Sequence, residues 1–86
     1  MNEKNKPVKK FVVGTISATI WENIKTKTEN NKTINYSIYS INIEKSYKKD
    51  NEWKKTNSFN VEDLPKINLV TFEAYKYLTL MVLDNE

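Results

Sequence analysis

Apolar and polar residues alternate through much of the chain up to about residue 61, and the spacing then becomes helical. Over residues 11–23, Val12, Ile16, Ala18 and Ile20 fall on one face of an extended chain, which we expect to face the core. The opposite face is mostly hydroxyl-bearing and ends at Trp21. The alternation predicts strands over residues 11–23, 33–47 and 52–61.

Three features interrupt this alternation. Gly14, the only glycine, indicates a bulge or a bend in the first strand. Residues 25–32 contain no apolar side chain and are predicted to form a loop. Within 33–47 the apolar residues change parity between Ile38 and Tyr39, which indicates a bulge, a bend, or a strand buried on both faces.

Residues 64–82 are predicted to form a helix. Asp63 is a suitable N-cap, and Pro65 lies in the first turn, where its missing N–H costs nothing. The apolar arc of this helix is wider than one small sheet requires. The helix is therefore either deeply buried in its own core or shared between two subunits. In the second case we expect a homodimer whose interface contains Leu69, Phe72, Tyr77 and Leu80.

The length of 86 residues predicts one domain, residues 11–86, preceded by a flexible N-terminal tail of residues 1–10. The chain has no histidine and no cysteine, so it lacks the commonest general base and the thiolate ligands of metals. We therefore expect no enzyme, no metal or other cofactor and no small-molecule substrate. No stretch approaches the roughly 18 apolar residues of a membrane span, and the absence of cysteine suits the cytoplasm.

Positive charge is concentrated in the first part of the chain. Residues 1–55 hold 12 lysines and 6 acidic residues, whereas residues 56–86 hold 2 lysines and 5 acidic residues. This asymmetry indicates a polyanionic partner or, alternatively, a solvated lysine-rich surface. Every basic residue is lysine, which attracts phosphate but lacks the forked geometry with which arginine recognises guanine. A nucleic-acid partner would therefore be bound with weak sequence preference.

Aromatic residues interleaved with lysines provide the candidate site. Single-stranded nucleic acid is held by a basic track for its phosphates and by flat rings on which its bases stack. Trp53 shares a parity with Phe59 and Val61, so it is a candidate for the core as well as for the site. The candidate residues are Trp21, Asn23, Lys25, Lys45, Tyr47, Lys48, Trp53 and Lys54.

The run from Tyr39 to Phe59, YSINIEKSYKKDNEWKKTNSF, resembles the strand–turn–strand of bacterial single-strand DNA-binding proteins. It also resembles the positive-cofactor-four-like and Whirly group of transcriptional coactivators. Only a helix follows the hairpin, so the order of elements over residues 11–82 is similar to the second group. That resemblance implies an α+β fold, with a curved antiparallel sheet of three to four strands followed by one C-terminal helix. It also implies a dimer and a single strand held by Trp21, Lys45, Tyr47, Lys48, Lys54 and Thr56.

The sequence thus predicts a sequence-tolerant protein that binds single-stranded DNA or RNA, with DNA preferred, and that forms a homodimer. The alternative is a protein-interaction or regulatory module that docks a partner through its apolar C-terminal helix.

Overall fold

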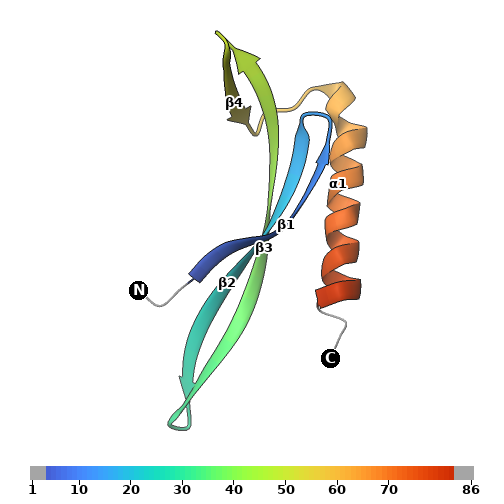
Figure 1. Ribbon diagram of the computed structural model, residues 1–86. Coiled ribbons are helices and arrows are strands. Elements are labelled where there is room, and N and C mark those ends of the chain that lie inside the picture. Colours follow the sequence, from blue (N-terminus) through green and yellow to red (C-terminus); the bar gives the residue numbers. More distant parts are fainter. Residues whose placement is uncertain (1–3, 83–86) are drawn as a thin grey trace.

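A computed structural model describes residues 4–82 and shows four antiparallel strands followed by one helix (Figure 1). The strands follow one another in the sheet in the order β1-β2-β3-β4, and the sheet is twisted and open. This confirms the predicted α+β class. The elements are β1 (Lys4–Val13), β2 (Ile16–Glu29), β3 (Lys32–Lys49), β4 (Glu52–Thr56), a 3-10 turn (Val61–Asp63), α1 (Leu64–Lys76) and a π-helical turn (Tyr77–Val82).

The predicted first strand is in fact a hairpin. Gly14 has a φ of 61° and, with Thr15, forms the two-residue turn between β1 and β2. The turn changes the parity of the preceding residues, so that Val13 lies opposite Ile16. Val12, expected in the core, therefore points away from the helix and is 58% exposed.

Strands extend into two segments that composition alone assigned to a tail and a loop. Residues 4–10 form the first part of β1, because their backbone pairs with residues 19–24 of β2. The remainder of the predicted tail, residues 1–3, lies outside the described residues. The predicted loop at 25–32 is the end of a long hairpin, in which only Asn30 and Asn31 leave the ladder. Both have positive φ, as a type I′ turn requires.

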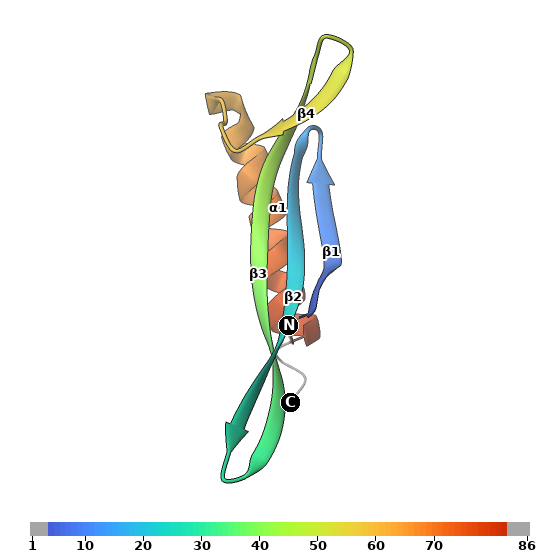
Figure 2. The same cartoon turned by 90° about the vertical axis from the view of Figure 1, so that its left-hand side faces the viewer.

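Helix α1 packs on one face of β1 and β2 and forms the core with them (Figure 2). Ile16, Ala18 and Ile20 project from β2 and are fully buried, which confirms their predicted role. Helix α1 contributes Val70 and Ala74, and the π-helical turn that continues it contributes Leu78. These six residues form two small clusters, one around Val70 and one around Ala74 and Leu78.

The parity change in β3 lies where α1 ends along the sheet. The pairing of β2 with β3 runs without a register shift, so no bulge is present there. Near α1, the helix side of β3 carries Tyr39, Ile41 and Ile43, opposite Glu22, Ile20 and Ala18. The hairpin continues beyond α1, and its apolar residues Ile34, Tyr36 and Ile38 lie on the other face (Figure 1). They are 42–45% exposed.

Candidate nucleic-acid interface

The sheet has one face against α1 and a second face on which no other described element packs (Figure 2). We call this second face the open face. Side chains alternate between the two faces of a strand, and the buried Ile16, Ala18 and Ile20 identify the helix side of β2. The register of the strands then assigns every other paired residue to one face.

Both tryptophans belong to the open face. Trp21 lies on β2 opposite Ser40, and Trp53 lies on β4 opposite Lys48. Trp53 is 66% exposed, whereas Trp21 is partly buried. Tyr36, opposite Lys25, adds a third ring closer to the tip of the β2–β3 hairpin.

A hollow of about 290 Å³ lies beside Trp53 on the open face. Ser17 is only 7% exposed although it faces away from the helix. The hollow therefore combines a wide aromatic ring, an ammonium group and small hydroxyl groups. Its lining residues are Lys10, Val12, Gly14, Thr15, Ser17, Ser46 and Trp53.

The structure divides the predicted site residues between the two faces. Their adjacent positions along the chain cannot all share one side of a strand, because successive side chains alternate. The register places Trp21, Asn23, Lys25, Lys48 and Trp53 on the open face. It places Lys45, Tyr47, Lys54 and Thr56 on the helix side.

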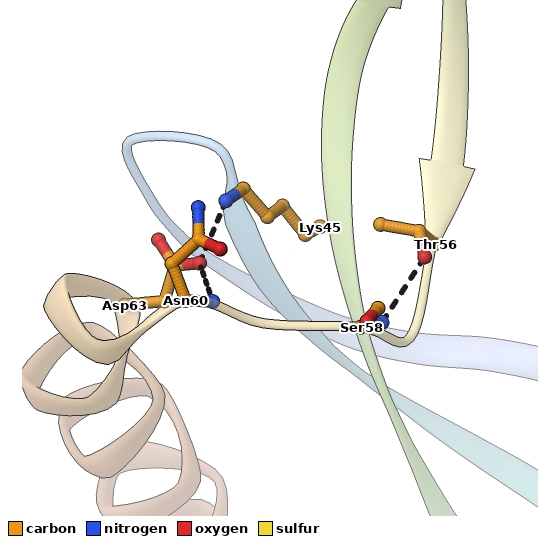
Figure 3. Close-up of polar contacts among 5 residues, drawn as sticks. All are labelled: Lys45, Thr56, Ser58, Asn60 and Asp63. Atoms are coloured by element: carbon orange, nitrogen blue, oxygen red, sulfur yellow. Dashed lines mark hydrogen bonds and ion pairs between the residues drawn. The ribbon is translucent and has the colours of Figure 1, made fainter.

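Two residues of the helix-side group have structural contacts. The Lys45 ammonium donates a hydrogen bond to Asp63 Oδ2 at 2.7 Å, and both side chains are largely buried (Figure 3). The same Oδ2 accepts the Asn60 N–H at 2.8 Å, whereas Asp63 makes no side-chain bond to the first turn of α1. Asp63 thus occupies the predicted N-cap position of α1, but its carboxylate joins β3 to the start of the helix and makes no capping bond. Thr56 Oγ1 accepts the Ser58 N–H at 3.0 Å, just after β4 ends.

The hydrogen bond from Lys45 lowers the pKa of Asp63 from its ordinary value of 3.8, and the Asn60 N–H lowers it further. Both donors stabilise the ionised carboxylate, and burial opposes them more weakly. Asp63 is therefore charged at neutral pH and holds Lys45 in a neutralising pair. Lys45 is a poor candidate for binding phosphate.

Two further lysines belong to the open face beside Trp53. Lys10 lines the hollow, and Lys55 lies opposite Ser46, two residues from Trp53. Lys55 also contacts Glu44 at 3.7 Å. The period of two along β4 could have identified Lys55 in the sequence, but Lys10 was assigned to the tail.

Of the four residues predicted for a dimer interface, three are exposed and Tyr77 is partly buried. Leu69 and Phe72 are 46% and 55% exposed on α1, and the Lys76 ammonium lies 5.4 Å from the centre of the Phe72 ring. Tyr77 instead packs edge-on against Phe11, with ring centres 6.2 Å apart. Leu80 is 58% exposed.

Comparison with models of protein families, with curated proteins and with solved structures finds no match to this chain. Within residues 4–82, no helix is both long enough and apolar enough to cross a membrane.

Proposed function

We propose that the chain binds single-stranded nucleic acid along the open face of its sheet. The observation that carries this proposal is Trp53, a tryptophan 66% exposed beside a hollow lined by Lys10 and hydroxyl groups. Bases stack on such a ring with little dependence on their identity, while lysines attract the phosphates. The absence of arginine supports weak sequence preference.

Trp21 and Tyr36 extend this surface along the sheet. From Lys48, opposite Trp53, to Ser40, opposite Trp21, the chain advances eight residues along β3. At about 3.3 Å per residue the two tryptophans are about 26 Å apart along the strand. A single strand of several nucleotides would be needed to reach both rings, so short oligonucleotides should bind less tightly than longer ones.

The test compares two exposed rings on opposite sides of the protein. Trp53→Ala should lower the affinity for fluorescently labelled oligo-thymidine by about 5- to 150-fold, since a stacked ring contributes about 1–3 kcal/mol. Tyr75→Ala is the matched control, because Tyr75 is 63% exposed but lies on α1. It should leave the affinity unchanged.

Fluorescence anisotropy of the oligonucleotide measures binding without relying on the tryptophans. Duplex DNA of the same length should bind less well, because its bases are already stacked. Absence of any binding at low salt would refute the proposal, as would equal losses in the two variants.

A further inference from the structure

Within residues 4–82, four stretches of sheet edge have no strand paired to them. They are the outer edge of β1, the outer edge of β4, residues 26–29 of β2, and the stretch of β3 from Lys32 to Glu44, which lies beyond the end of β4 pairing. Exposed edges invite pairing with another chain, and proteins usually protect them with proline, lysine, bulges or short length.

Three of the four edges carry such protection. β1 contains Pro7, a register shift between Pro7 and Lys9, and several lysines. β4 is only five residues long, and three of its residues are charged. The free end of β2, residues 26–29, is short and includes Lys27 and Glu29. None of these three edges offers a regular, uncharged template for a further strand.

The free stretch of β3 carries none of these features between its ends. It contains no proline, no register shift and no charged residue between Lys32 and Glu44, and it is rich in isoleucine and tyrosine. Next to it on the helix side, an apolar groove of about 350 Å³ is lined by Ile41, Ile43, Thr71, Ala74, Tyr75 and Leu78. This edge is therefore suited to accept a strand.

We propose that this strand is the same segment of a second copy of the chain, paired antiparallel about a twofold axis at Ile38. The bounds of the free stretch determine the register. Ile38 is its midpoint, so every residue from Lys32 to Glu44 finds a partner. An axis at Ile41 would instead place residues 33–37 where β4 of the second copy lies.

Charge complementarity favours a second copy as the occupant. In this register Lys32 lies opposite Glu44 of the second copy, and the reverse pair forms at the other end. Both residues have register positions on the open face, so their side chains meet on the same side of the sheet. Ile38 faces its own counterpart at the axis. The strand is thus complementary to itself.

The small core supports the same conclusion. Within residues 4–82 only six apolar residues are buried, and Ile34, Tyr36, Ile38 and Ile41 remain 42–45% exposed. Domains of this size often need an additional source of stability, and association is one. Pairing would give an eight-stranded sheet with both helices on one side and both open faces joined on the other.

A single charge at the axis tests the proposal. Sedimentation of the wild-type chain at about 50 µM should show twice the chain mass of 10.2 kDa. Ile38→Lys places two like charges opposite each other and should raise the dimer dissociation constant by about tenfold or more. Val12→Lys, at a position on β1 that is 58% exposed against 45% for Ile38, should not. Circular dichroism of each variant establishes that it is folded.

Cysteine cross-linking tests the register in this cysteine-free chain. Ile38→Cys should give a disulfide-linked dimer on mild oxidation. Ser40→Cys should not, because the two Ser40 positions would be about 13 Å apart along the strands, beyond disulfide reach. A wild-type chain that sediments as a monomer would overturn the proposal. So would a dimer whose dissociation constant is unchanged in Ile38→Lys and that is not cross-linked in Ile38→Cys. Either result leaves the nucleic-acid assay above unaffected.

Discussion

Two pairs of lysines in the β3–β4 hairpin allow the charge of the open face to be tested separately from the charge of the chain. Lys48 and Lys55 belong to the open face, whereas their sequence neighbours Lys49 and Lys54 belong to the helix side. Replacing either pair by glutamine lowers the net charge of +3 equally. Each pair also contains one lysine that forms an ion pair with a glutamate. Lys55 lies 3.7 Å from Glu44, and Lys54 lies 3.8 Å from Glu52.

The expected magnitude is worked for four phosphate contacts, made by the open-face residues Lys10, Lys25, Lys48 and Lys55. Each contact with the phosphate of a single strand contributes about 0.7 to the slope of log affinity against log salt. Four contacts give a slope of about −2.8, so that affinity falls about 50-fold between about 50 and 200 mM salt. Without Lys48 and Lys55 the slope becomes about −1.4 and the fall about 7-fold.

The assay is anisotropy of a labelled oligo-thymidine at several salt concentrations. The variant Lys48→Gln/Lys55→Gln should have the flatter slope, and the variant Lys49→Gln/Lys54→Gln should run parallel to the wild type. Equal flattening in both variants would show that the polyanion responds to total charge, and the assignment of binding to the open face would then be wrong.

Two further predictions concern stability. Ile20→Ala should lower the free energy of unfolding in urea by about 2–5 kcal/mol, because Ile20 is fully buried. Ile34→Ala, in the part of the β2–β3 hairpin beyond α1, should lower it by about 1 kcal/mol or less. Similar losses in the two variants would contradict the position of the core. The lowered pKa of Asp63 means that its stabilising contribution is present above its ordinary value of 3.8 and is lost as pH falls through its value in the folded protein. Asp63→Asn should therefore melt at a lower temperature than the wild type at pH 7, and the difference should shrink toward pH 2; a constant difference would count against the ion pair with Lys45.

The core and the helix were predictable because each depends on one uninterrupted period. Ile16, Ala18 and Ile20 alternate within a single strand, whereas Val70, Ala74 and Leu78 recur every four residues along α1 and the turn that continues it. Pro65 correctly indicated the first turn of that helix. Both patterns can be recognised in the sequence without knowing which strands lie next to each other.

The turn at Gly14 was less accessible, because alternation continues on both sides of it and a two-residue turn leaves little trace in composition. Residues 4–10 and 25–29 are mostly polar, and their backbone pairing was therefore not predicted. The candidate site was only partly predictable for a related reason. Neighbouring residues such as Tyr47 and Lys48 look like one cluster in the sequence but project to opposite sides of β3.

The paired positive-φ residues at Asn30 and Asn31 have a consequence for how this protein can vary in length. Inserting one residue in either strand of the β2–β3 hairpin would turn every later side chain of that strand to the opposite face. Inserting two residues in each strand preserves both faces and lengthens the hairpin by about 7 Å. The projecting hairpin can therefore change its reach only in such increments, while the core beneath α1 stays the same.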